Sequence, residues 1–170
     1  MSKVILWHDP IKDRLCVTMP SYNDRTRPPG ATEDEFIARV IAKAVPAGVS
    51  TRLVDDTDPG LQDRTFRNAL EDTGVAVRVN MPKARDLQMN YIRAVRNAEL
   101  VRLDTDFLRA LENDDVVERQ RIVGTKRILR DIPQTFDLSV YATPEELKTA
   151  WPVEIPRPAG EIGRNDAAKH

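Results

Sequence analysis

The amino-acid sequence predicts an α+β fold, with a small N-terminal β-hairpin and a mixed β/α part followed by a long helix and a helical hairpin. Three observations support this prediction. Short β-prone runs alternate with turn residues through the first half of the chain. A helical pattern then continues from Asn80 to about Leu111. In addition, 31% of the residues are charged and only 5% are aromatic, which favours solvated helices around a modest core.

The N-terminal segment, residues 1–30, is predicted to be a β-hairpin followed by a linker. Residues 4–7 and 15–19 are β-prone runs, and the residues between them are typical of a turn. Residues 21–30 contain Asn, Asp, Gly and two prolines, which interrupt regular structure. The hairpin is therefore expected to be separated from the next element by an irregular segment.

Residues 31–80 are predicted to form a small α/β part. A capping-box pattern at Thr32 starts its helix, because a threonine and a glutamate three residues later can satisfy each other's backbone N–H groups. A strand over residues 50–54, a short helix over residues 64–71 and another strand over residues 75–79 are expected to follow.

Residues 81–133 are predicted to form the helical hairpin. Pro82 is well placed in a first helical turn, where its missing N–H costs no hydrogen bond. The apolar face of the first helix rotates near residues 104–106, which indicates either a changed packing partner or a bend. Residues 113–115 are typical of a turn and helix cap, and the second helix is expected over residues 116–130, ended by the proline that follows.

The remaining chain is divided into a short C-terminal helix within residues 134–151 and an extended tail, residues 152–170. A further capping box, with Thr143 and Glu146 at its two key positions, starts the short helix. The tail is rich in proline and glycine, so we expect it to have no core of its own.

Few residues of the kinds used by metals and nucleophilic catalysis are present. Cys16 is the only cysteine, and the two histidines are His8 and His170, so the roughly four ligands of a structural zinc site are not available. Residues 55–60 are acidic like a calcium-binding loop, but the position that needs a bidentate glutamate is Phe66. We therefore predict no enzymatic activity, no metal and no cofactor.

Two alternative functions remain open at this point. One is a small DNA-binding regulator that uses the basic cluster at 119–130, although the 26 basic and 27 acidic residues nearly cancel and acidic residues are interleaved with that cluster. The other is an enzyme with an unrecognised carboxylate pair, Asp104 and Asp106, which point in different directions on a helix. The basic cluster consists of Arg119, Arg121, Lys126, Arg127 and Arg130.

Several short motifs occur in an order that resembles a known family. They are DRTFRNA at 63–69, VNMPKAR at 79–85, IRAVR at 92–96, LRDIP at 129–133 and FDL at 136–138. Together they resemble small proteins encoded beside tail and tail-fibre genes in tailed bacteriophages and prophages. The part from about Tyr91 to Pro133 is similar to phage tail assembly chaperone domains. The resemblance implies a tail-associated protein acting in tail or tail-fibre assembly through protein–protein contacts, either as an assembly chaperone or as a component retained in the virion.

The long helix is the expected contact surface for a phage tail or tail-fibre protein or for copies of this chain. A helix of about thirty residues is about 45 Å long, so part of its apolar surface is expected to extend past its own fold. We predict partner-binding anchors at Tyr91, Leu103, Phe107 and Leu108, each of which could also pack inside the hairpin. The first half is expected to pack on the β-containing body.

The expected location follows from the resemblance and from the lack of a membrane signal. No apolar run approaches the roughly 18 residues that a membrane-spanning helix needs. We therefore expect the protein in the host cytoplasm during assembly or in the virion tail, with no membrane contact.

Overall fold

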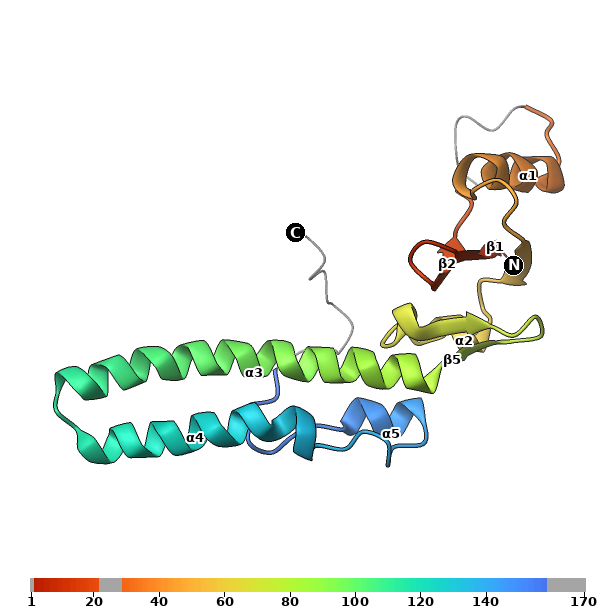
Figure 1. Cartoon of the computed structure of the whole chain (residues 1–170). Helices are drawn as coiled ribbons and strands as arrows, with labels where there is room; N and C mark the ends of the chain where they lie inside the picture. The colour runs from red at the N-terminus through yellow and green to blue at the C-terminus, as the bar shows by residue number, and fades with distance from the viewer. Residues whose placement is uncertain (1, 22–28, 159–170) are drawn as a thin grey trace. The chain divides into compact units, whose positions relative to one another are not determined.

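The chain has the predicted α+β class, and it divides into two compact units, Met1–Asn80 and Met81–His170 (Figure 1). This computed structural model describes residues 2–21 and 29–158. Most of the predicted linker and the end of the predicted tail, including His170, lie outside the described residues.

The first unit is built on a three-stranded antiparallel sheet in the order β2-β1-β3. Its strands are β1 (Lys3–Asp9), β2 (Arg14–Thr18) and β3 (Thr51–Asp55). The predicted β1–β2 hairpin is confirmed. Its turn is closed by Asp9, whose Oδ1 accepts hydrogen bonds from the backbone N–H groups of Ile11 and Lys12.

Both faces of this sheet are covered, because alternate residues of β1 point in opposite directions. Ile5 packs with buried Ile37 of α1 (Glu33–Ala44), the helix that begins with the predicted capping box, and with Val45 at its end. Val4 and Leu6 pack on the other face with a second, two-stranded sheet. That sheet consists of β4 (Leu70–Asp72) and β5 (Val77–Val79).

The predicted helix over residues 64–71 is wrong. The structure has the short helix α2 (Pro59–Gln62), the 3-10 turn η1 (Arg67–Ala69) and then β4. Leu70 and Val77 are buried in the core, so tertiary packing favours the extended backbone at this point. Gly60 of α2 is required for the close approach, because a Cβ there would lie 2.2 Å from the carbonyl oxygen of Val77.

A bidentate ion pair joins the two sheets of the first unit. The Arg52 guanidinium donates to Asp72 through Nε to Oδ2 at 2.8 Å and through Nη2 to Oδ1 at 2.5 Å. These hydrogen bonds hold the pKa of Asp72 below its ordinary value. The geometry fixes β3 against β4 at one position.

The second unit consists of α3 (Met81–Glu112), α4 (Val116–Thr135) and α5 (Pro144–Thr149). α3 has 32 residues and runs as one helix through residues 104–106. α4 continues past its predicted end, with Pro133 inside its last turn. It therefore tolerates the proline near its C-terminus, where only one backbone hydrogen bond is lost.

The predicted tail is partly wrong as well. Pro152 and Ile155 are buried, and the Trp151 indole Nε1 donates a hydrogen bond to the carbonyl oxygen of Ile155 at 3.1 Å. Pro152 and Ile155 therefore belong to the core of the second unit, while Val153 and Glu154 between them are exposed. The proline-rich composition correctly predicted that these residues form no helix or strand, but it did not predict that two of them are buried.

Candidate functional site

The two halves of α3 are covered by different parts of the chain. The proximal half of α3 consists of residues 81–96. It is contacted by α5 and by the residues around α5. In the distal half, residues 97–112, α4 runs alongside α3 and Asp104 bonds to Lys126. The expected change of packing partner therefore exists, but it lies before residues 104–106. The proximal half packs on the C-terminal segment of its own unit, a cover that the sequence prediction did not foresee.

Polar anchors hold the C-terminal segment on the proximal half of α3. Gln88 is fully buried, and its Nε2 donates to the carbonyl oxygen of Ala150 at 2.8 Å. The Arg85 guanidinium donates through Nη2 to the carbonyl oxygen of Tyr141 at 2.9 Å. Both anchors bond to backbone carbonyl groups. They therefore position the backbone of the C-terminal segment and not its side chains.

Tyr91 belongs to this covered region. Its ring is half-buried and lies 5.5 Å from the Trp151 ring, centroid to centroid, with the planes tilted by 58°. This geometry is typical of a stabilising aromatic pair. Tyr91 thus has an aromatic partner within its own unit.

The core of the distal half is apolar with one exception. Leu103 of α3 and Ile122 and Leu129 of α4 are buried. The exception is Lys126, whose Nζ is 2.5 Å from Asp104 Oδ1 and 5.1 Å from the centre of the Phe107 ring. A buried ammonium needs such compensation, and here a carboxylate and an aromatic face provide it.

The four predicted anchors therefore have different environments. Leu103 is 2% exposed and has no free surface, so its prediction as a surface anchor is corrected to a core residue of the hairpin. Phe107 is half-buried beside Lys126, and Tyr91 is half-buried beside Trp151. Leu108 is the one of the four that is largely exposed, at 57%.

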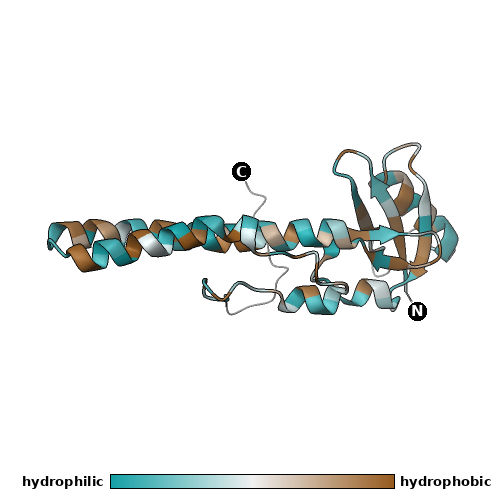
Figure 2. Ribbon diagram, turned by 60° about the horizontal axis from the view of Figure 1, so that its bottom comes forward, coloured by the Kyte–Doolittle hydropathy of each residue, from teal (hydrophilic) through white to brown (hydrophobic). Residues whose placement is uncertain are grey.

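Leu108 is one of four exposed apolar residues that flank the α3–α4 turn in the sequence. We call this group the turn-end surface; it consists of Leu108, Leu111, Val116 and Val117, which are 57%, 49%, 51% and 79% exposed. Figure 2 shows hydrophobic residues continuing along both helices of the hairpin as far as the turn. The sequence prediction missed the last three of these residues, although their position on either side of the turn residues 113–115 could have indicated them.

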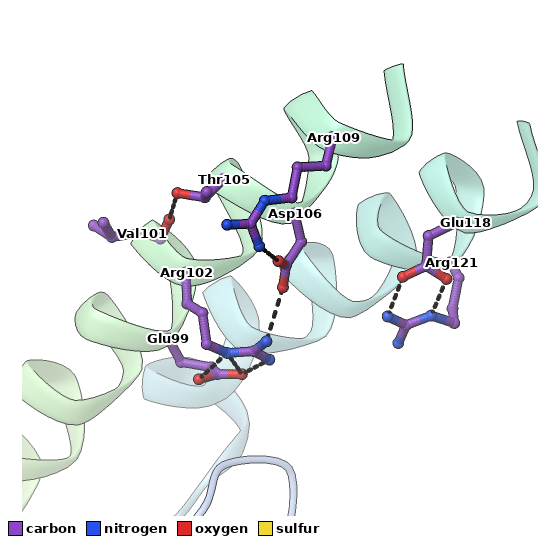
Figure 3. A network of polar contacts seen from close by, with 8 residues as sticks. All are labelled: Glu99, Val101, Arg102, Thr105, Asp106, Arg109, Glu118 and Arg121. Atoms are coloured by element: carbon purple, nitrogen blue, oxygen red, sulfur yellow. Dashed lines mark hydrogen bonds and ion pairs between the residues drawn. The ribbon is translucent and has the colours of Figure 1, made fainter. Parts of the chain in front are cut away.

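The charged face of the distal half forms its own ion pairs (Figure 3). Arg102 donates to Glu99 and, through Nη1, to Asp106 at 2.8 Å. Arg109 also reaches Asp106. Hydrogen bonds from Arg102 hold the pKa of Glu99 below its ordinary value. Such pairs at helical spacing stabilise a solvated helix modestly.

Three of the five residues in the basic cluster at 119–130 form ion pairs. Arg119 pairs with Asp114 at 3.1 Å, and Arg121 pairs with Glu118 at 2.6 Å. Lys126 is directed into the hairpin toward Asp104. These pairs reduce the positive charge that the cluster presents to a phosphate backbone, which weakens the DNA-binding alternative, but Arg127 and Arg130 are exposed.

The acidic residues considered in the sequence have other partners in the described part of the chain. Asp104 bonds to Lys126 while Asp106 bonds to Arg102, so the two carboxylates do not converge. In the predicted acidic turn, Asp58 accepts from the N–H of Gly60 and caps α2. No group of three or more metal-binding side chains occurs among residues 2–21 and 29–158. Within those same ranges, no helix is long and apolar enough to cross a membrane.

No known protein family, curated protein or solved structure matches this chain. The resemblance to phage tail assembly proteins therefore stays a prediction from the motifs.

Proposed function

We propose that this protein acts in the assembly of a bacteriophage tail or tail fibre through protein–protein contacts. It does so as an assembly chaperone or as a component retained in the virion, in the host cytoplasm during assembly or in the virion tail. The motif order supports the phage attribution, and the turn-end surface supports the mode of action.

The exposed turn-end surface is the observation that carries this proposal. Its four apolar side chains lie within about two helical turns of one end of the hairpin. Exposed apolar residues are typical of contact surfaces, and here four of them flank the turn of a hairpin that also carries ion pairs. Val101, Val123 and Ile128 are exposed farther along the same two helices. The partner is a tail or tail-fibre protein whose apolar surface is unprotected before assembly, and the hairpin end covers that surface.

The test is co-purification with the product of the neighbouring fibre gene. The variant Leu108→Asp/Val117→Asp places two charges on the turn-end surface, and we expect it to lose the fibre protein. The matched control is Val75→Asp, because Val75 is 89% exposed but lies in the first unit. The control is expected to recover the fibre protein as well as the unaltered chain does.

Mass spectrometry of purified virions then separates the two versions of the proposal. Detection of the protein in mature particles identifies a retained component, and its absence together with successful co-purification identifies a chaperone. If the fibre protein is not recovered and the virions also lack this chain, the proposal is wrong.

A further inference from the structure

The first unit contains a cavity of about 460 Å³ that follows one edge of its three-stranded sheet. Residues 14–19, which include all of β2, line it without a gap. Alternate residues of a strand point to opposite faces, so a cavity that touches every residue in turn follows the backbone edge, and it also reaches Trp7 of β1. The opposite wall is formed by Leu61, Arg64, Arg67, Asn68 and Leu70.

This edge of the sheet is open in the described part of the chain. β2 is an outer strand in the order β2-β1-β3 and pairs only with β1. Among the backbone hydrogen bonds of the described residues outside helices and strands, none involves residues 14–19. The outward N–H and C=O groups of β2 therefore remain available to another extended chain.

The cavity wall is cationic. Arg14, Arg64 and Arg67 line it, and among the residues that the structure describes its lining contains no aspartate or glutamate. Arg14 Nε is buried and has no hydrogen-bond partner within residues 2–21 and 29–158. Its neighbour in the strand register is Asp9, which uses Oδ1 to close the β1–β2 turn. A buried guanidinium nitrogen without a partner is costly, and an anionic group from outside would satisfy it.

Apolar side chains line the cavity as well. Leu15 and Val17 line the cavity from β2, and Met19 just beyond β2 is 62% exposed. Methionine adapts its shape to different side chains, which suits a contact with a peptide. The lining thus combines backbone groups, guanidinium groups and apolar side chains, the three features used when a peptide adds a strand to a sheet.

We propose that the outer edge of β2 binds an extended acidic peptide segment of a partner protein. The segment pairs with the backbone of β2, its carboxylates bond to Arg14, Arg64 and Arg67, and its apolar side chains contact Leu15, Val17 and Met19. This docking surface lies in the first unit, so it goes beyond the turn-end surface and does not depend on it.

The test uses the full chain and a fluorescent octapeptide of alternating valine and glutamate with blocked ends. Two further octapeptides serve as probes: one with glutamine in place of glutamate and one with alternate backbone nitrogens methylated. Binding is measured by fluorescence anisotropy at low and moderate salt. We expect the acidic peptide to bind more weakly at moderate salt, and the other two peptides to bind about tenfold more weakly or not at all.

The informative variant is Arg64→Gln/Arg67→Gln, because both side chains are exposed and their replacement leaves the core intact. We expect it to raise the Kd for the acidic peptide about tenfold. Arg78→Gln is the matched control, since Arg78 is an exposed arginine of the same unit outside the cavity lining. The Leu108→Asp/Val117→Asp variant is expected to bind the peptide normally, which separates this proposal from the proposed function.

Three outcomes overturn the proposal. The first is no binding of the acidic peptide, and the second is an equal loss of binding in the Arg78→Gln control. The third is unchanged binding of the methylated peptide together with displacement by inorganic phosphate, because that result identifies a small-anion site instead of a strand-docking edge.

Discussion

The proximal and distal halves of α3 belong to one continuous helix but are stabilised in different ways. The proximal half is covered by a segment far along the chain, which it holds through Gln88, Arg85 and Tyr91. The distal half runs alongside α4 and relies on Leu103 inside and ion pairs outside.

The distribution of exposed apolar residues differs as well. Within α3, which the structure describes throughout, all exposed large apolar residues lie in the distal half: Val101, Leu108 and Leu111. A helix pair has only one shared seam, so an apolar residue outside that seam stays exposed. The exposed apolar surface of α3 therefore lies in its distal half, which has fewer covering elements. A partner is expected to bind there.

The largest effect is expected when buried and exposed leucines of the distal half are compared. Leu103→Ala should lower the free energy of unfolding by about 2–5 kcal/mol, because it leaves a cavity in the α3–α4 seam. Leu108→Ala should change it by less than about 0.5 kcal/mol. Urea unfolding followed by circular dichroism measures both. Equal losses in the two variants would break the distinction between core and surface leucines.

A smaller loss is expected from the proximal half. Trp151→Ala removes the ring that packs on Tyr91 and the hydrogen bond to Ile155. It should lower the free energy of unfolding by about 2 kcal/mol, which is less than the loss of a fully buried ring would cause. Limited proteolysis should then cut the chain after α5 more rapidly. Val153→Ala is the control, because Val153 is 95% exposed. Unchanged protection in Trp151→Ala would contradict this account of the proximal half.

Gly124→Ala in α4 should raise the free energy of unfolding by about 1 kcal/mol. A Cβ at Gly124 would meet nothing within 4 Å, so the glycine weakens the helix without serving a close helix approach. Gly48→Ala is the contrasting control, since its backbone has φ +81° and should be strained by the same change. Thermal unfolding of the two variants should shift in opposite directions, and a loss of stability in Gly124→Ala would be inconsistent with an open site.

The smallest effect is expected when the pH is lowered. The pKa of Glu99 is lower in the folded chain than its unfolded value of about 4.3, so its stabilising contribution is present above that pH and is lost as the pH falls through the folded value. Glu99→Gln should remove this pH dependence. Hydrogen exchange at decreasing pH should report it in the distal half and not around Gln88. A uniform response along α3 would show that the ion pairs do not distinguish the halves.

The sequence predicted the elements that have strong local signals. The capping boxes at Thr32 and Thr143 start helices where expected, and the pattern after Asn80 identified the long helix. Local signals did not identify β4, because its extended backbone depends on the burial of Leu70 against a distant strand. They also missed the burial of Ile155, which lies within a proline-rich segment.

The candidate site was predicted only in part for the same reason. Leu103 and Leu108 are both apolar residues of one helix, and only the position of α4 makes one of them core and the other surface. Gln88 gave no sequence signal at all, since a polar residue on a helix is usually solvated. Its burial depends on a chain segment 62 residues away.

The buried amide of Gln88 restricts how the C-terminal segment can align with α3. Apolar contacts alone would tolerate a shift of the C-terminal segment along α3, because aliphatic surfaces at neighbouring positions resemble each other. A shift by one residue would turn the carbonyl of Ala150 away from Gln88 Nε2 and leave a buried donor unpaired, at a cost of about 1–3 kcal/mol. The hydrogen bond therefore adds little net stability but excludes neighbouring alignments, so the hairpin and the segment that closes it have one common register.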